Sequence, residues 1–321
     1  MELKQLTIGD TELAVSELCL GCLPFGPKLT GRDVDDLINV FRDGGGNFFD
    51  TAHCYSCWHP CGDGASEKAL GDYIKTNDCR DSVVIATKGG YPGMDNYRKV
   101  DSYLSPGRIA ADIDDSLGRL KTDVIDLYWL HRDDPRIPVE EILETLNAEV
   151  TRGRIRYFGG SNWTSSRLAE ANTYANEHGL DGFVASQPLW NLLEQKDMAE
   201  AHRLEPGVLL HVNEEDRRWH SDSQLPVLPF TPAARGFFAM EGNAPEDYIT
   251  EENTARAGRV MKLASELGAT PGQVALAWLQ AQPFPVIPIL GTSDRAHLKD
   301  ALGTADVVLS ESQASWLETG E

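Results

Sequence analysis

The sequence lacks the features that would indicate a membrane-spanning or secreted protein. No apolar run approaches the roughly 20 residues that a helix needs to cross a bilayer, and Met1–Gln5 do not lead into the apolar core of a signal peptide. Internal repeats and low-complexity tracts are also missing. We therefore expect one domain over residues 1–321, located in the cytoplasm, with no membrane partner.

Positive charge is scarce in this chain. It has 29 Lys and Arg against 50 Asp and Glu, which gives a formal net charge of −21 at pH 7. A surface of this sign repels the phosphates of nucleic acids and anionic lipid headgroups. The charge balance therefore argues against nucleic acid as a partner, and an anionic ligand would need a local basic patch.

The cysteines are few and unevenly distributed. Cys19-x₂-Cys22 and Cys54-x₂-Cys57 have the spacing of zinc ligands, and Cys61 follows closely. Cys19 and Cys22 lie in a predicted strand, however, where residues three apart point to opposite faces. We therefore expect no metal and no disulfide, but reduced cysteines that pack as small apolar side chains. Zinc binding is the alternative.

Strand-like and helix-like segments alternate along the whole chain. The predicted strands are 18–21, 47–50, 82–88, 124–130, 155–159, 183–186, 227–230 and 286–289. The predicted helices are 33–43, 66–75, 106–120, 139–152, 165–178, 254–267 and 271–280, with the sixth barrel helix and an insertion expected somewhere in 191–224. This order favours an α/β fold with a closed (β/α)₈ TIM barrel and elaborated loops at its C-terminal face.

An open doubly wound sheet is the alternative fold. That fold needs a Gly-rich G-x-G-x-x-G turn directly after an early strand. The run Gly44-Gly45-Gly46 precedes a predicted strand and lacks this spacing. The sequence therefore favours the barrel.

Ionisable side chains stand at the ends of three consecutive predicted strands. Asp50, Lys88 and His131 close the second, third and fourth strands, and Tyr55 follows Asp50 by five residues. In an α/β barrel these strand ends lie at one mouth, where catalytic groups are found. We therefore expect the four side chains to meet in one pocket.

Such a set of groups suits the reduction of a carbonyl compound. Hydride added to a carbonyl carbon leaves charge on the oxygen, which then needs a proton donor. A phenol has a pKa of about 10, and an ammonium about 4 Å away is expected to lower it by roughly two or three units. We expect Tyr55 to be the general acid, Lys88 to lower its pKa, Asp50 to hold Lys88, and His131 to orient the substrate oxygen.

Several segments resemble the aldo-keto reductase family, in the family's order from about Leu18 to Leu302. They include Asn47-Phe-Phe-Asp-Thr-Ala52, Ala65-Ser-Glu-Lys-Ala-Leu-Gly71, Ile85-Ala-Thr-Lys88, Asp126-Leu-Tyr-Trp-Leu-His131, Phe158-Gly-Gly-Ser-Asn162, Ala234-Arg-Gly236 and Ile287-Pro-Ile-Leu-Gly-Thr292. The resemblance implies a (β/α)₈ barrel that reduces an aldehyde or ketone by direct hydride transfer from NADPH. It also implies Asp50, Tyr55, Lys88 and His131 as the catalytic tetrad.

The resemblance further implies which residues bind the cofactor. The nicotinamide end would contact Ser161, Asn162, Gln187 and Phe230, the last at a position where Tyr is commoner in the family. The phosphates would contact Thr231, Ala233, Arg235, Gly291, Thr292, Ser293, Arg295 and His297. Gly291 to Ser293 are expected to begin the eighth helix, whose amides attract phosphate. The family often has Arg or Gln at position 297 and Asn at position 301, so NAD stays an alternative to NADP.

The loop after Tyr55 suggests a substrate class. Trp58 and His59 are expected to line the substrate cleft, with loop packing as the alternative. Together with Arg132-Asp133-Asp134, they favour a sugar or another polyhydroxylated carbonyl compound. Two other functions stay open, a non-catalytic nicotinamide-binding regulatory protein and a metal-dependent hydrolase that uses the Cys- and His-rich loop. The oligomeric state is not indicated.

Overall fold

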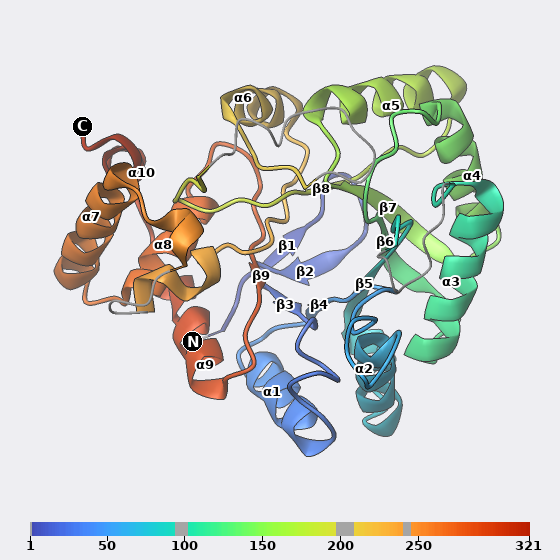
Figure 1. The fold of residues 1–321 in the computed structure, drawn as a ribbon, viewed down its shortest axis with the longest axis horizontal. Helices are drawn as coiled ribbons and strands as arrows, with labels where there is room; N and C mark the ends of the chain where they lie inside the picture. The colour runs from blue at the N-terminus through green and yellow to red at the C-terminus, as the bar shows by residue number, and fades with distance from the viewer. Residues whose placement is uncertain (1, 94–101, 197–208, 240–244) are drawn as a thin grey trace.

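The computed structural model describes residues 2–93, 102–196, 209–239 and 245–321. Strands lie at the centre of the molecule and helices surround them (Figure 1). In chain order the elements are β1 (Gln5–Thr7), β2 (Ala14–Ser16), β3 (Cys19–Gly21), α1 (Arg32–Asp43), β4 (Phe48–Asp50), α2 (Ala65–Thr76), β5 (Val84–Gly89), α3 (Pro106–Leu120), β6 (Ile125–Leu130), α4 (Val139–Thr151), β7 (Ile155–Ser161), α5 (Ser165–His178), β8 (Ser186–Gln187), α6 (Glu214–Ser223), α7 (Glu251–Leu267), α8 (Pro271–Gln280), β9 (Ile289–Leu290), α9 (Arg295–Leu302) and α10 (Glu311–Thr319).

The parallel strands close into a barrel. Seven of them form one sheet in the order β8-β7-β6-β5-β4-β3-β9. Val227 bridges Ser186 in β8 on one side and Val286 just before β9 on the other. The backbone around Val227 therefore takes the place of the missing seventh barrel strand, and the predicted (β/α)₈ barrel is confirmed. That residues 1–321 make a single domain stays a prediction.

The last barrel strands are shorter than predicted. The segments predicted at 183–186 and 286–289 become the two-residue strands β8 and β9, and 227–230 makes only isolated bridges. Four prolines lie in or beside these segments, at positions 226, 229, 285 and 288. Proline has no amide hydrogen to donate to a strand ladder. The apolar runs predicted the strands' places, and the prolines explain why the ladders are short.

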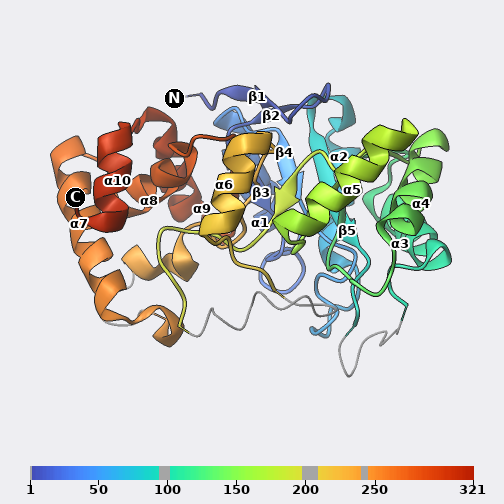
Figure 2. The same ribbon diagram turned by 90° about the horizontal axis from the view of Figure 1, so that it is seen from above.

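A hairpin that the sequence interpretation missed seals one end of the barrel. β1 and β2 pair in antiparallel fashion, and Figure 2 shows them at the end opposite the long loops. Ile8, Leu13 and Val15 of the hairpin segment pack against Phe48 and Trp129 inside the barrel. The hairpin therefore closes the N-terminal end with apolar side chains.

The barrel helices follow the predicted ranges within a few residues wherever the apolar period is clear. In α1 the buried residues are Val34, Leu37, Ile38 and Phe41, which is the spacing of one helical face. The sixth barrel helix, expected in 191–224, is α6, while the C-terminal helix α10 was not predicted. No helix in the described ranges has the length and apolar character of a bilayer span.

The eighth barrel helix begins later than predicted. It starts at Arg295, so Gly291, Thr292 and Ser293 belong to the link that follows β9. Asp294 caps the helix by accepting hydrogen bonds from the backbone amides of Ala296 and His297. Aspartate is a preferred residue at this position because its carboxylate satisfies amides that lack helical partners. The predicted start at 291–293 is therefore wrong.

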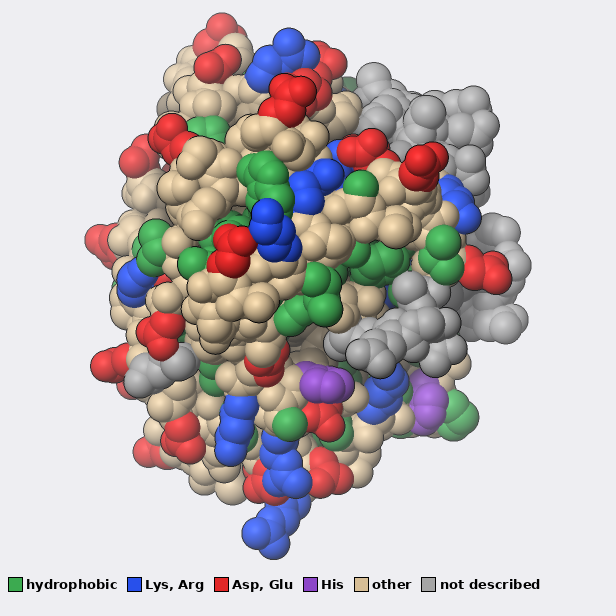
Figure 3. All heavy atoms as spheres, turned by 90° about the vertical axis from the view of Figure 1, so that its left-hand side faces the viewer, with side chains coloured by type: hydrophobic (Ala, Val, Ile, Leu, Met, Phe, Trp, Pro, Cys, Tyr) green, Lys and Arg blue, Asp and Glu red, His purple; other side chains and the backbone are tan. Residues whose placement is uncertain are grey.

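The surface formed by α7 and α10 carries both signs of charge. Acidic and basic side chains are interspersed there, with apolar side chains between them (Figure 3). The net charge of −21 is therefore not gathered on this face as a single acidic patch.

Gly71 allows α2 and α3 to approach closely. A Cβ atom at this position would lie 2.5 Å from the carbonyl oxygen of Arg119 and 2.7 Å from that of Leu120. Gly118, on the exposed side of α3, has open space around the same hypothetical atom. The close contact between the two helices is therefore possible because glycine has no side chain at position 71.

We expect Gly71→Ala to destabilise the protein by about 1–3 kcal/mol, because the added methyl group meets backbone that must move. The matched control is Gly118→Ala, which removes flexibility from the unfolded chain without a clash and should be neutral or stabilising by up to about 1 kcal/mol. Urea unfolding followed by circular dichroism measures both. Equal effects of the two substitutions would contradict this account of the α2–α3 contact.

Candidate active site

The alternation of side chains along the barrel strands brings polar groups into its mouth. Phe48 in β4 and Ala86 in β5 point into the barrel interior. Residues two positions further along each strand face the same side, and these are Asp50 and Lys88. His131 continues β6 in the same way, two residues beyond an interior tryptophan. The strand period thus explains why residues far apart in sequence meet.

Lys88 is the centre of this group. Its Nζ donates hydrogen bonds to Asp50 Oδ2 at 2.5 Å, to the carbonyl oxygen of Thr51 at 2.8 Å and to Tyr55 Oη at 3.0 Å. Asp50 is 2% exposed and Lys88 is 1% exposed. All three ammonium donors therefore have partners, and they fix the tyrosine hydroxyl relative to the carboxylate.

Lys88 keeps its charge although it is buried. Burial by itself opposes the ammonium, but Asp50 and Tyr55 together raise the pKa of Lys88 above its ordinary value. For Asp50, burial raises the pKa, while the contacts with Lys88 and Gln187 counteract that rise. The pair is thus a charged ion pair held in a site that excludes water, and each partner is needed to keep the other ionised.

Tyr55 holds its proton more strongly than the sequence analysis expected. The residue as a whole is half-buried, but its hydroxyl lies at the buried end beside Lys88. Burial raises the pKa of Tyr55 to about 12, although Lys88 acts to lower it. The expectation of a pKa below the usual value is therefore wrong, because Asp50 offsets the ammonium charge and burial disfavours the phenolate. At neutral pH the phenol is a proton donor.

His131 is a neutral imidazole. Burial lowers the pKa of His131 well below its usual value, and the nearby charges of Arg132 and Lys88 lower it further. Its Nδ1 lies 3.5 Å from Cys54 Sγ, and burial raises the pKa of that thiol, which therefore stays protonated. No other described side chain bonds to the ring, so Nε2 stays available to a ligand.

Three residues predicted to hold a nicotinamide lie directly beside this group. Gln187 Nε2 donates to Asp50 Oδ1 at 2.9 Å, and Ser161 Oγ donates to the backbone oxygen of Gln187 at 2.9 Å. Asn162 Nδ2 donates to Ser161 Oγ at 3.0 Å and to the backbone oxygen of His131 at 3.2 Å. Within the described ranges nothing donates to Gln187 Oε1. An amide ligand such as a carboxamide fits this free acceptor.

The residues predicted to contact phosphates are more dispersed. Phe230, Thr231 and Ala233 follow the bridge at Val227, and the backbone is left-handed at Thr231, with φ 59°. Arg235 pairs with Asp247 at 2.7 Å. That ion pair is half-exposed, and such pairs contribute little energy, so the guanidinium can exchange its partner for a phosphate.

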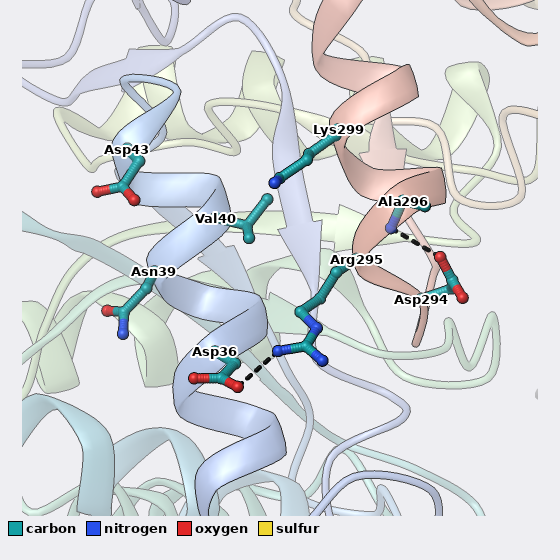
Figure 4. A pocket seen from close by; sticks show the side chains of 8 residues that line it. All are labelled: Asp36, Asn39, Val40, Asp43, Asp294, Arg295, Ala296 and Lys299. Atoms are coloured by element: carbon teal, nitrogen blue, oxygen red, sulfur yellow. Dashed lines mark hydrogen bonds and ion pairs between the residues drawn. The ribbon is translucent and has the colours of Figure 1, made fainter.

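Arg295 lines a groove between α1 and α9 (Figure 4). It pairs with Asp36 of α1 at 2.6 Å. The groove has a volume of about 570 Å³, and its other lining residues are Asn39, Val40, Asp43, Asp294, Ala296 and Lys299. None of them belongs to the group around Lys88. His297 is exposed on the same helix, and Gly291, Thr292 and Ser293 lie before that helix.

The two predicted substrate residues lie on the loop after Tyr55. Trp58 is 52% exposed, and His59 Nδ1 lies 3.1 Å from Cys61 Sγ. In the described part of the chain neither makes a hydrogen bond or a ring contact with the four side chains at the mouth, and their role stays a prediction. Trp163 and Trp190 are buried and belong to two of the hydrophobic clusters of the protein.

The cysteines are all free thiols. Cys19 lies in the cluster inside the barrel, whereas Cys22 lies in the outer cluster beneath the helices, so the two point to opposite faces as expected. Across the described residues, no group of three or more His, Cys, Asp or Glu side chains is arranged to hold a metal ion. The zinc alternative gains no support from this arrangement.

Arg119, whose role the sequence analysis missed, forms hydrogen bonds at both ends of the Tyr55 loop, and we call this set of bonds the arginine clasp. Arg119 of α3 donates to the backbone oxygen of His53 at 3.0 Å and to Glu67 Oε2 at 3.2 Å. It also donates to Asp63 Oδ2 at 2.9 Å. The close approach of α2 and α3 brings this arginine within reach. Glu67 was part of a recognised motif, but its partner in another helix could not be read from the sequence.

Comparisons with known proteins agree with the geometry. The model of the family described as "Aldo/keto reductase family" matches residues 17–319. An uncharacterized oxidoreductase, YrpG, of Bacillus subtilis is 30% identical over 95% of this chain and 91% of its own length. A putative aryl-alcohol dehydrogenase of Schizosaccharomyces pombe is 29% identical over 97% and 93%. A probable voltage-gated potassium channel subunit beta of rice (Oryza sativa subsp. japonica) is 28% identical over 94% and 90%.

The buried ion pair yields a stability prediction. Lys88→Met leaves the Asp50 carboxylate buried without its partner and should cost about 3–5 kcal/mol of unfolding free energy. The double variant Asp50→Asn, Lys88→Met removes both charges and should recover part of that loss. Urea unfolding of the wild type and both variants provides the comparison. A double variant no more stable than Lys88→Met would show that the uncompensated charge is not the cause.

Proposed function

This chain belongs to the aldo/keto reductase family, and from that membership we propose that it reduces an aldehyde or ketone to an alcohol with NADPH. The family match and the similar oxidoreductases indicate that this chain is an oxidoreductase. The observation that carries the proposal is the placement of Lys88 Nζ between Asp50 and Tyr55, at 2.5 and 3.0 Å. This arrangement holds a proton donor at a fixed point in the barrel mouth.

Each of the four side chains has a distinct task in the proposed reaction. A bound reduced nicotinamide would supply the hydride to the carbonyl carbon. Tyr55 Oη donates its proton to the carbonyl oxygen as that oxygen gains electrons. Lys88 fixes the hydroxyl and stabilises the phenolate that remains, while Asp50 keeps Lys88 charged. His131, as a neutral imidazole, orients the carbonyl oxygen toward Tyr55.

The cofactor would lie along β7, β8 and the link after β9. Ser161, Asn162 and Gln187 would hold the carboxamide, since they form one hydrogen-bonded group next to Asp50. Phe230 would stack on the nicotinamide ring. Farther along, Thr231, Ala233, Arg235, Gly291, Thr292, Ser293, Arg295 and His297 would contact the phosphates. We expect NADPH rather than NADH on the family resemblance.

Two classes of substrate are considered, polyhydroxylated carbonyl compounds and aromatic aldehydes. Asp133 and Asp134 are buried and pair with Arg167 and Arg136, which leaves only Asp133 Oδ1 without a hydrogen-bond partner in the described structure. The proposal of a polyhydroxylated substrate therefore depends mainly on Trp58 and His59. The relative named as an aryl-alcohol dehydrogenase makes aromatic aldehydes the first compounds to test.

A regulatory nicotinamide-binding protein is the second candidate. The relative named as a potassium channel subunit favours it. A protein that only binds the cofactor has no need for a buried ammonium against a tyrosine hydroxyl, so we place reduction first. Cofactor binding without turnover on any aldehyde or ketone would reverse this order.

We expect Tyr55→Phe to lower kcat for aldehyde reduction by about 10²- to 10⁴-fold, because the substitution removes the proton donor. NADPH affinity, measured by cofactor fluorescence, should stay near the wild-type value. The matched control is Tyr157→Phe, which changes a half-buried tyrosine of β7 whose hydroxyl accepts a hydrogen bond from the backbone amide of Glu12, in the turn between β1 and β2. Retained turnover in Tyr55→Phe would reject this residue as the acid.

The pH profile tests the protonation states. Reduction needs the protonated phenol, and because the pKa of Tyr55 is raised to about 12, that form persists through the neutral range. The pKa of His131 is lowered well below its usual value, so it adds no change near neutrality. We expect kcat for reduction at saturating NADPH to stay level between about pH 6.5 and about pH 9. A decline across that range would indicate that the tyrosine has a lowered pKa.

A further inference from the structure

Arg132 shares a corner of the barrel mouth with His131. Its guanidinium lies over the ring of Tyr91, 5.8 Å from the ring centre. The Tyr91 ring is itself 5.1 Å from the imidazole of His131. Because the imidazole also lies beside Tyr55, with ring centres 6.1 Å apart, a cation and two aromatic rings border the place where a carbonyl group would react.

Among the described residues this cation has no acidic partner. Within them it makes one hydrogen bond, from Nη1 to the backbone oxygen of His131 at 2.9 Å. Of the adjacent carboxylates, Asp134 bonds Arg136 at 2.7 Å, and Asp133 bonds Arg167 through Oδ2 at 3.2 Å while its buried Oδ1 has no hydrogen-bond partner in the described structure. In the described ranges no carboxylate pairs with Arg132. Acidic side chains outnumber basic ones by 50 to 29 in this protein, so a guanidinium without one is unusual here.

The surroundings make this missing partner energetically significant. Burial lowers the pKa of Arg132 from its usual value, with Tyr91 and Cys54 counteracting that effect. A guanidinium nevertheless stays charged at neutral pH. Arg132 is half-buried, so its charge is only partly hydrated, and an anion that enters the mouth would offset the cost of that lost hydration. The remaining donors, Nε and Nη2, form a planar fork of the kind that binds a carboxylate with two hydrogen bonds.

The position of Arg132 points to the substrate rather than to the cofactor. The residues expected to bind nicotinamide lie in or directly after β7, β8 and the bridge at Val227, whereas Arg132 follows β6 and its guanidinium lies over the ring of Tyr91, which follows β5. In the sheet, β6 separates β5 from β7. Arg132 and Asn162 donate to the same backbone oxygen of His131, and the guanidinium extends from there over Tyr91. A group bound by Arg132 would therefore lie between Tyr91 and the tetrad, next to the nicotinamide end of the cofactor.

We propose that Arg132 is a specificity-determining residue that binds a carboxylate on the substrate, so the preferred substrates are aldehydes or ketones that carry a carboxylate. This inference rests on the proposed function. The net negative charge of the chain repels anionic substrates, so such a substrate needs a local cation in order to bind. Tyr91, which is flanked by Arg132 and His131, offers a surface on which an aromatic ring between the two functional groups can pack.

The test compares two aldehydes of similar size, para-formylbenzoate and para-tolualdehyde, with the wild type and Arg132→Gln. We expect the wild type to prefer the anionic aldehyde. In Arg132→Gln, kcat/KM for para-formylbenzoate should fall by roughly 10- to 100-fold, mainly through KM, because a charge-assisted hydrogen-bonded pair is lost. With para-tolualdehyde kcat/KM should change by less than about threefold.

Two further variants separate recognition from structure. Arg132→Lys keeps the charge but not the fork, and should retain part of the preference. Arg136→Gln removes the exposed arginine that pairs with Asp134 in the same segment, and should leave the ratio of the two substrates unchanged. A substrate ratio that falls equally in Arg132→Gln and Arg136→Gln would overturn the proposal, because the effect would then come from the segment and not from Arg132.

Calorimetric binding of the product alcohol, para-(hydroxymethyl)benzoate, decides the inference independently of turnover. Weaker binding to Arg132→Gln than to the wild type supports the proposal, and equal binding overturns it. Turnover of both aldehydes without a preference for the anionic one also overturns it while leaving the proposed function intact. Absence of turnover with either aldehyde counts against the proposed function, and the calorimetry then still decides whether Arg132 binds carboxylates.

Discussion

The ion pair between Lys88 and Asp50 is the constraint on which the barrel mouth depends. An ammonium that is 1% exposed stays charged only beside a carboxylate, and this carboxylate is on the neighbouring strand. The register that pairs Asp50 with Ala86 therefore determines where the tyrosine hydroxyl is held. A slip of one residue between β4 and β5 would turn one of the two charges out of the interior. The proposed proton transfer therefore requires the same β4–β5 register that the buried ion pair requires.

The interior positions of the site could be predicted because strands have a period of two. Asp50, Lys88 and His131 each end or follow a clear apolar run, so their strand ends and their shared mouth followed from spacing alone. The regularity of the later strands could not be predicted in the same way. Pro229 and Pro288 lie within apolar runs that look like strands, yet they cannot donate to a ladder, and the barrel closes there through isolated bridges.

Contacts between side chains on different helices and strands could not be predicted from the sequence. Nothing in the spacing of Arg119 indicates that it reaches across to Glu67 and Asp63. The pKa of Tyr55 was misjudged for a related reason, because the interpretation counted the attraction of Lys88 and left out the cost of burial. The start of α9 was misplaced because Asp294, not the preceding glycine segment, satisfies the first amides. In each of these cases the outcome depends on which groups are neighbours in three dimensions.

The arginine clasp has a consequence for how this family member could diversify. Because α3 ties down the loop at His53 and again at Asp63, the stretch between these anchor points can change its outer residues without moving its base. Trp58 and Pro60 project from that stretch. Replacement of such residues could alter which molecules are admitted while the proton donor keeps its place, so selectivity and reactivity can evolve separately within a single short segment.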